Sequence, residues 1–369
     1  MLYITFNDPP SGIYYSQVTD VCSFMSERFN INIKLVAFIS LRNFFQNKNA
    51  IKKKYKNSIV LPMFPGVKNW KKNYFSLSFL KTDKIIARGP FAAWLALKLK
   101  SNGKANSVCF DARGAYAAEF NEYNVSGEAN INSEIYELEK FVLTNSDKRI
   151  SISNKLVEYW EKEYSYSGKE QVIIPCTLNK FYEKDYSYQE YKDVRKKNNI
   201  TENEILLVYS GSDSPWQSLK TVYPFLDNIL KQNENVKLLL LTKKIDDEHL
   251  FFKYGTRVIQ KWLEPNNVRD WLLACDYAVL LREQSVTNQV ASPVKFAEYL
   301  SCGLKILISE NIGDYSEFVK RHLVGLVLNE LNGKINFLFV PKEEKTRISK
   351  LGQITFSKSE YINSYKKLL

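Results

Sequence analysis

Short, unbroken apolar runs alternate with helical stretches through the second half of the chain, and this alternation constrains the fold more than any other feature. Unbroken apolar runs of this length are typical of parallel strands that are buried on both faces of a sheet. Parallel strands must be joined by long crossovers, which are usually helices. The pattern therefore predicts a doubly wound α/β sheet. Its predicted strands are residues 205–210, 236–242, 257–262, 277–282, 305–309 and 326–329.

The first half of the chain has the same pattern in a less regular form. The predicted fold class is therefore α/β, with two Rossmann-like, doubly wound domains in tandem. A polar, tyrosine-rich stretch without strand periodicity separates them and is predicted to be a linker. The predicted parts are a first domain (1–176), the linker (177–200), a second domain (201–355) and a C-terminal helix (356–369). The predicted strands of the first domain are 2–6, 33–40, 58–62, 84–88, 107–111, 149–153 and 171–175.

Composition excludes several classes of protein. Hydrophobic residues make up 45% and charged residues 25% of the chain, as in folded soluble proteins. The five cysteines are scattered without a CxxC pair, so neither a disulfide framework nor a zinc site is predicted. The opening stretch, MLYITFNDPPSG, reads as a strand and a turn without the features of a signal peptide. No apolar run approaches the roughly 20 residues that span a bilayer, so we expect a cytoplasmic protein.

The net charge of +12 is concentrated in one segment of the first half. Nine of the 52 basic residues, and none of the 40 acidic ones, lie between Leu41 and Leu80, while the charges elsewhere nearly balance. Aromatic residues are interleaved with these lysines, which suits the headgroup region of an anionic membrane. A solvated helix face for the lysines and core packing for the aromatics are the alternatives. The residues assigned to this surface are Lys52, Lys53, Lys54, Trp70, Lys71 and Lys72.

A helix followed by a strand is predicted from SPVKFAEYLSCGLKILIS, residues 292–309. Ser292 is a good N-cap and Pro293 suits the first helical position. Glu298 lies too far into the helix to help its dipole, roughly 7 to 8 Å along the axis from Pro293. That is about the distance from a diphosphate held at Ser292 to an attached ribose, whose two hydroxyls a carboxylate can accept. The alternative is a surface pair with Lys295.

The pattern P-x-K-x-x-E-Y-L-x-C-G-L, residues 293–304, resembles the donor-site signature of the retaining, GT-B-fold group 1 glycosyltransferases. The resemblance implies two Rossmann-like domains that face a central cleft, with Glu298 on the nucleotide ribose. YSGSDSPWQSL, residues 209–219, is similar to the phosphate-loop region of that family. FNDPPSGIYYSQV, residues 6–18, resembles its first glycine-containing loop, which implies that Gly12 faces the cleft.

This sequence also departs from the family pattern. The first of the family's two glutamates falls on Val290, and the usual Arg and Lys that clamp the diphosphate are not evident. Arg282 and Lys295 are our substitutes, with a strand-end surface cation and a partner for Glu298 as the respective alternatives. FDARGAYAAE, residues 110–119, resembles the family's substrate loop, and Arg113 stands where that loop often has a histidine. Pairing of Arg113 with Asp111 is the alternative to substrate contact there.

The predicted site therefore has catalytic and donor-binding parts. Arg282, Lys295 and Arg113 are the predicted catalytic residues. The predicted donor-binding residues are Glu298, Ser292, Pro293, Gly211, Ser212, Asn288 and Gly12.

The resemblance implies transfer of a sugar, with retention, from a UDP- or GDP-linked donor to a glycan or lipid-linked acceptor in surface polysaccharide biosynthesis. A lipid-linked acceptor would place the protein peripherally on the anionic inner face of the plasma membrane. Stabilising the leaving phosphate is the main service that a protein can give this reaction. No convincing DxD motif is present, since Asp246 and Asp247 fall on a predicted surface helix. We therefore expect neither a metal nor a cofactor.

Two other classes of function stay open. A nucleotide-sugar epimerase of the same fold needs positioned proton donors and acceptors, and the chain has only two histidines, His249 and His322. A non-catalytic protein that binds nucleic acid would use the lysines. No RNA-recognition, zinc-finger or glycine-lysine phosphate-loop signature supports that function, so no specific nucleic-acid partner is expected.

Overall fold

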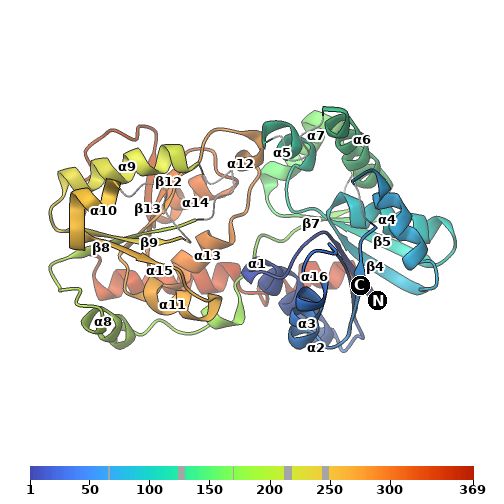
Figure 1. The fold of residues 1–369 in the computed structure, drawn as a ribbon, viewed down its shortest axis with the longest axis horizontal. Helices are drawn as coiled ribbons and strands as arrows, with labels where there is room; N and C mark the ends of the chain where they lie inside the picture. Colours follow the sequence, from blue (N-terminus) through green and yellow to red (C-terminus); the bar gives the residue numbers. More distant parts are fainter. Residues whose placement is uncertain (65–66, 124–128, 169, 212–217, 243–248) are drawn as a thin grey trace. The chain divides into compact units, whose positions relative to one another are not determined.

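The computed structural model describes residues 1–64, 67–123, 129–168, 170–211, 218–242 and 249–369 (Figure 1). They form two compact units. The first unit comprises Met1–Asn179, Val290–Ser292 and Lys358–Leu369, and the second comprises Lys180–Gln289 and Pro293–Ser357. The chain therefore passes between the units more than once, and residues 290–292 belong with the first unit although their neighbours on both sides belong with the second.

The described residues of the first unit contain a seven-stranded parallel sheet in the order β3-β2-β1-β4-β5-β6-β7. The chain first builds the sheet outward from β1 through β2 to β3. It then returns to the other side of β1 with β4, so the order reverses between β1 and β4. The strands are β1 (Leu2–Phe6), β2 (Lys34–Ile39), β3 (Ser58–Pro62), β4 (Thr82–Arg88), β5 (Ala105–Asp111), β6 (Lys148–Ser151) and β7 (Gln171–Ile173).

Helices cover this sheet, and local sequence explains several of their ends. The Ser153 hydroxyl accepts the backbone N–H of Leu156 and so caps α7, and Asn30 ends α2 in the left-handed conformation. A π-helical turn, η1, joins α1 to α2. The elements are α1 (Gly12–Tyr14), η1 (Tyr15–Thr19), α2 (Asp20–Phe29), α3 (Phe44–Lys54), the 3₁₀ segment η2 (Val67–Ser76), α4 (Gly89–Ser101), α5 (Tyr116–Tyr123), α6 (Ala129–Asn145), α7 (Asn154–Tyr164) and α16 (Ile362–Leu368).

The described residues of the second unit contain a six-stranded parallel sheet in the order β10-β9-β8-β11-β12-β13. Here the order reverses between β8 and β11. Every strand lies within two residues of its predicted bounds, and the four central strands are mostly buried apolar runs, whereas the edge strands β10 and β13 are partly exposed. The strands are β8 (Ile205–Ser210), β9 (Val236–Leu241), β10 (Val258–Lys261), β11 (Tyr277–Leu280), β12 (Lys305–Ser309) and β13 (Gly325–Leu328).

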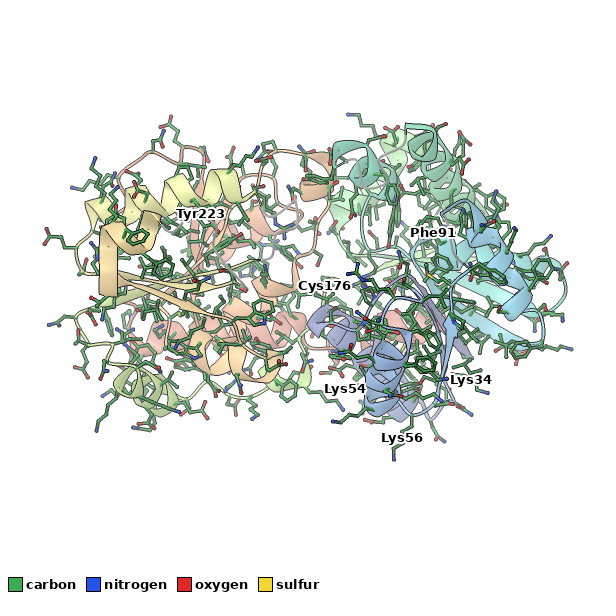
Figure 2. All side chains as sticks on the ribbon, in the orientation of Figure 1. Lys34, Lys54, Lys56, Phe91, Cys176 and Tyr223 are labelled. Atoms are coloured by element: carbon green, nitrogen blue, oxygen red, sulfur yellow. The ribbon has the colours of Figure 1, made fainter. Side chains whose placement is uncertain are left out.

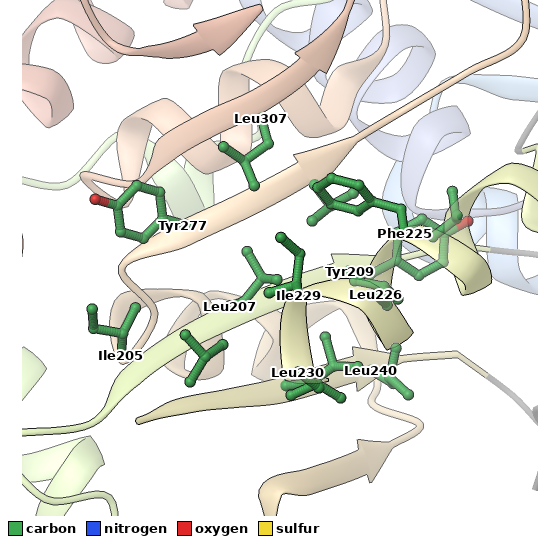
Figure 3. Packing of buried hydrophobic residues seen from close by; sticks show 14 of the residues in the cluster. Ile205, Leu207, Tyr209, Phe225, Leu226, Ile229, Leu230, Leu240, Tyr277 and Leu307 are labelled. Carbon is green, nitrogen blue, oxygen red and sulfur yellow. The ribbon is translucent and has the colours of Figure 1, made fainter. Parts of the chain in front are cut away.

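The core of the second unit lies between this sheet and α9 (Figure 3). Phe225, Leu226, Ile229 and Leu230 follow one another at helical spacing and pack on the apolar strands. The remaining elements are η3 (Lys180–Tyr182), α8 (Tyr188–Lys197), α9 (Leu219–Gln232), α10 (His249–Tyr254), η5 (Gly255–Arg257), α11 (Pro265–Leu273), α12 (Val286–Gln289), α13 (Val294–Ser301), α14 (Tyr315–His322) and α15 (Lys342–Phe356).

The stretch predicted as a linker, 177–200, contains helix α8, whose Tyr191 and Arg195 are buried in the second unit. The Arg195 guanidinium lies 3.0 Å from the Asp276 carboxylate, which anchors this helix beside the sheet. The stretch predicted as a C-terminal helix, 356–369, contains α16 (Ile362–Leu368), whose Tyr365 and Leu368 join the core of the first unit. None of the helices within the described ranges is long and apolar enough to cross a membrane.

Candidate functional site

Two predicted site residues follow the adjacent strands β8 and β11 at the carboxyl edge of the second sheet. Gly211 comes directly after β8, and Arg282 comes two residues after β11. The strand order reverses between these two strands, and ligands of open α/β sheets bind beyond the carboxyl ends of the strands at such a reversal. The topology therefore places Gly211 and Arg282 where this architecture binds ligands.

Helix α13 brings another predicted site residue, Lys295, to the same edge. The Lys295 ammonium donates a hydrogen bond of 2.5 Å to the carbonyl of Ser210, the last residue of β8. A side chain at Gly211 would collide with the Tyr209 ring, so the chain can turn closely here only with glycine. At its other end, α13 is followed by Gly303, with a φ of +78°. A Cβ there would lie 2.7 Å from the Lys345 carbonyl oxygen.

The start of α13 differs from the prediction. The helix begins at Val294 with Pro293 as its cap, so Ser292 is not the N-cap. The Ser292 hydroxyl instead accepts the backbone N–H of Cys176 at 2.8 Å, in the first unit. A hydrogen-bond partner that is distant in sequence thus replaces the local capping bond. The prediction that Ser292 caps this helix was wrong by one residue.

Arg282 is held by its neighbours. Its side chain donates to the Asn288 side-chain oxygen at 3.1 Å, and its backbone N–H donates to the Ser309 hydroxyl at 2.9 Å. Asn288 is fully buried, and its amide donates to the Glu283 carbonyl at 3.0 Å. Asn288 therefore orients the guanidinium in this structure. Its predicted place in the donor site stays a prediction.

Burial shifts the protonation of both charged groups on α13. Burial and the nearby Arg282 lower the pKa of the Lys295 ammonium to about 7, against the opposing effect of Glu298. Burial raises the pKa of the Glu298 carboxyl to about 7, although Lys295 partly offsets it. Arg282, Lys295 and Glu298 therefore form a charged cluster at this edge, where a bound anion would favour the charged form of Lys295.

Several predicted residues lie outside the described part of the chain. Ser212 belongs to the loop after β8, and Asp246 and Asp247 belong to the stretch before α10. Among the residues that are described, no group of three or more His, Cys, Asp and Glu side chains is arranged to hold a metal ion.

The first sheet carries a different charged cluster, which we call the first-unit network: Tyr3, Asp8, Arg88, Asp111 and Arg113. Arg88 lies 2.8 Å from Asp8 and 3.8 Å from Asp111. Asp111 lies 3.3 Å from Arg113 and accepts the Tyr3 hydroxyl at 2.6 Å. The sequence indicates Arg113 and its pairing with Asp111 but not the roles of Arg88 and Asp8. Arg88 ends a predicted strand, as Arg282 does, and this position at a strand end could have identified it.

Arg113 also reaches toward the chain that leaves β7. Its guanidinium contacts the Gln17 side-chain oxygen at 3.3 Å and the Cys176 sulfur at 3.1 Å (Figure 2 labels Cys176). The adjoining cavity, of about 10 Å³, has room for about one water molecule. The structure thus holds Arg113 in a closed network, and its catalytic role stays a prediction. Gly12 is exposed at the start of α1, after β1.

The lysines predicted for the basic surface are exposed, whereas the tryptophan predicted with them is buried. Lys52, Lys53 and Lys54 form the exposed last turn of α3, and Lys71 and Lys72 are exposed on η2. Trp70 is only 9% exposed, because its ring packs 5.0 Å from the rings of both Phe91 and Trp94. Trp70 is therefore a packing residue. The exposed aromatic residues of Leu41–Leu80, within its described part, include Phe45, Phe64, Phe75 and Phe79, at 77%, 41%, 71% and 68%.

No family model matches the sequence, and no curated protein sequence matches it. Solved structures, in contrast, match nearly the whole chain. Sucrose-phosphate synthase from Thermosynechococcus elongatus and Anabaena HepE in complex with UDP and glucose each match with a TM-score of 0.70 and 12% identity. WaaG, a glycosyltransferase involved in lipopolysaccharide biosynthesis, matches with a TM-score of 0.67 and 14% identity. Each match covers 100% of this chain and 98% of the other. The chain therefore has the GT-B fold of these proteins, and the predicted fold class is confirmed.

Proposed function

We propose that this protein is a glycosyltransferase that moves a sugar from a nucleotide-diphosphate donor to a glycan or lipid-linked acceptor. The carrying observation is that Arg282, Lys295 and Glu298 lie together at the carboxyl edge of the second sheet, beside the reversal of its strand order. A bound diphosphate would interact with the two cations, and the Glu298 carboxylate would accept the hydroxyls of the ribose. The HepE structure with UDP and glucose supports a nucleotide sugar as the donor.

The chemistry asked of these residues is electrostatic. The bond between the anomeric carbon and the diphosphate breaks, so positive charge develops on the sugar and negative charge on the leaving phosphate. Arg282 and protonated Lys295 would stabilise that phosphate. We propose retention of configuration, with the leaving phosphate taking the acceptor's proton. A metal ion is then unnecessary, so transfer should survive EDTA. Complete loss of activity that only Mg²⁺ or Mn²⁺ restores would contradict this phosphate site.

A thermal-shift panel of UDP-, GDP-, ADP- and CMP-sugars tests the proposal. A ligand that binds only the folded protein raises the unfolding temperature by mass action. We expect one nucleotide class to raise it, and radiolabelled sugar from that donor to appear in an added glycan or lipid-linked acceptor. No shift with any of the four classes would overturn the proposal. Interconversion of the donor sugar without any acceptor would identify an epimerase instead.

We also propose that the lysines of α3 hold the protein on the anionic inner face of the plasma membrane, where a lipid-linked acceptor of surface polysaccharide biosynthesis would lie. Each Lys near an anionic surface contributes about 1 kcal/mol, so replacing Lys52, Lys53 and Lys54 by Gln should weaken binding to phosphatidylglycerol vesicles about 100-fold. Donor binding should not change. The control removes the same charge from α8 by replacing the exposed Lys192, Lys196 and Lys197. Equal losses in both variants, or no vesicle binding by the unaltered protein at low salt, would contradict membrane docking.

A further inference from the structure

A cavity of about 420 Å³ lies in the first unit, lined by side chains of η2, α4 and α6. Its volume is within the range of sites that hold small organic ligands, roughly 300 to 1,000 Å³. Its aromatic lining consists of Trp70, Phe91, Trp94 and Phe141. Of the residues that line this cavity, only Trp70 and Lys71 were predicted as site residues, and the prediction assigned them to a membrane surface.

The inner end of the cavity lies near the carboxyl edge of the first sheet. Phe91, labelled in Figure 2, is on the first turn of α4, three residues after the end of β4. Its ring stacks 5.6 Å from that of Phe6, the last residue of β1. The strand order reverses between β1 and β4. The cavity therefore adjoins the place where an open α/β sheet binds ligands.

Charged groups of both signs line the cavity. Glu134 and Glu137 are exposed on α6. Lys71 is exposed on η2, and its ammonium lies over the rings of Trp70 and Trp94, at 5.5 and 5.8 Å from their centres. Carboxylates accept hydrogen bonds and the ammonium donates them, so a ligand between them can use both kinds of partner.

This combination favours one class of ligand. An anionic lipid headgroup would face two carboxylates for one ammonium, and an acyl chain would offer no hydrogen-bond partner to any of the three charged groups. A neutral saccharide has hydroxyls for the carboxylates and the ammonium, and the C–H face of its ring packs on aromatic side chains. We propose that this cavity binds a saccharide that is part of the acceptor glycan. That this saccharide belongs to the acceptor rests on the function proposed above, whereas saccharide binding itself does not.

The test is a titration of the full chain with neutral tri- to pentasaccharides of glucose, galactose, N-acetylglucosamine and rhamnose, followed by tryptophan fluorescence. We expect at least one to change the emission through Trp94, which is partly exposed in the cavity. The double variant Glu134→Gln, Glu137→Gln should weaken binding of that saccharide about tenfold or more, since hydrogen bonds to charged groups are the stronger ones. Phe141→Ala should weaken it as well, because Phe141 is 44% exposed and can be truncated without opening the core.

A control and a second readout separate the possible failures. Glu158→Gln removes a carboxylate from the exposed surface of α7 in the same unit and should leave saccharide binding unchanged. Loss of affinity in that control equal to the loss in the double variant would overturn the proposal. So would the absence of any saccharide binding in a protein that still binds its nucleotide sugar, or displacement of the saccharide by phosphatidylglycerol vesicles. Saccharide binding without any nucleotide-sugar binding would support the cavity and overturn the transferase function.

Discussion

Both sheets bring charged side chains to their carboxyl edges, but the two clusters balance their charges differently. In the first unit, burial alone would lower the pKa of Arg88, yet Asp8 and Asp111 outweigh it and raise that pKa above the ordinary value. Asp111 has the same effect on Arg113. In the second unit, burial and Arg282 lower the pKa of Lys295 to about 7. Carboxylates therefore offset the burial of both arginines in the first cluster, whereas burial and a neighbouring cation disfavour the charged form of Lys295 in the second.

This difference separates two roles that the sequence does not distinguish. A buried arginine with carboxylates on both sides holds strands and loops together, and removing one partner is costly. An anion that binds beside Arg282 and Lys295 would favour the charged form of the ammonium, as a phosphate does. We therefore expect a scaffolding role for the first-unit network and propose ligand binding for the cluster of Arg282, Lys295 and Glu298.

The largest effect should come from removing a carboxylate of the first-unit network. Asp111→Asn leaves Arg88 and Arg113 buried near a neutral amide, and we expect the free energy of unfolding to fall by about 3 to 5 kcal/mol. Urea denaturation measures it. The matched control is Asp147→Asn, which removes a partly exposed carboxylate paired with Lys100 and should cost about 1 kcal/mol or less. Similar losses in the two variants would show that the network is no scaffold.

A buried carboxyl without a cation offers the next test. Glu139 is fully buried and accepts hydrogen bonds from the backbone of Tyr116 and Ala117 and from the Tyr164 hydroxyl. Burial raises its pKa to about 7, although these hydrogen bonds partly offset the rise. The folded state therefore keeps a proton that the unfolded state releases near pH 4.5, so stability falls as pH rises from about 4.5 to 7.

That loss has an expected size and a simple control. Glu139 should contribute up to about 3 kcal/mol of it. Urea denaturation of Glu139→Gln from pH 5 to pH 8 should show a correspondingly smaller decline than in the unaltered protein. Glu158→Gln, on the exposed surface of α7, should keep the full decline. A decline of equal size in all three proteins would mean that Glu139 is ionised throughout this range.

Changes in the cluster of Arg282, Lys295 and Glu298 should alter ligand binding more than stability. Glu298→Ala removes a charged acceptor for the ribose hydroxyls, at about 1.5 to 3 kcal/mol for each lost hydrogen bond, so donor affinity should fall tenfold or more. Glu298→Gln should keep part of that affinity. Calorimetric titration with the donor identified in the panel measures it, and the unfolding temperature without ligand should change little. Glu317→Ala, an exposed carboxylate on α14, is the control. Unchanged affinity in Glu298→Ala would mean that Glu298 does not contact the donor.

The sequence predicts the strands well and their side-chain partners poorly. Buried apolar runs such as 205–210 identify strands because burial on both faces leaves no other pattern. The Asp8–Arg88 pair joins a residue that follows β1 to the last residue of β4, and only the strand order makes those two strands neighbours. Ser292 satisfies the local rule for a cap, but the backbone of Cys176 provides a tertiary partner that the local sequence does not reveal. Trp70 shows the same limit, since its burial depends on Phe91 and Trp94 of α4.

The smallest expected effect is proton exchange on donor binding, and it is the one most specific to the cluster of Arg282, Lys295 and Glu298. With both pKa values near 7, Lys295 is mostly neutral at pH 8 and Glu298 is mostly protonated at pH 6. A diphosphate favours the charged ammonium, so binding at pH 8 should take up a fraction of a proton. Ribose hydroxyls favour the ionised carboxylate, so binding at pH 6 should release one. A sugar nucleotide such as UDP-glucose suits the measurement because its diphosphate does not titrate in this range.

Calorimetry in two buffers of different ionisation enthalpy measures this exchange, because the apparent binding enthalpy then differs by the number of protons transferred. Lys295→Ala should abolish the uptake at pH 8 and keep the release at pH 6. Glu298→Gln should do the reverse, which assigns each proton to its residue although the two groups titrate together. The first-unit network, whose arginines stay charged over this whole range, should contribute nothing at either pH. Binding enthalpies that are independent of buffer at both pH values would mean that the donor does not bind against Lys295 and Glu298.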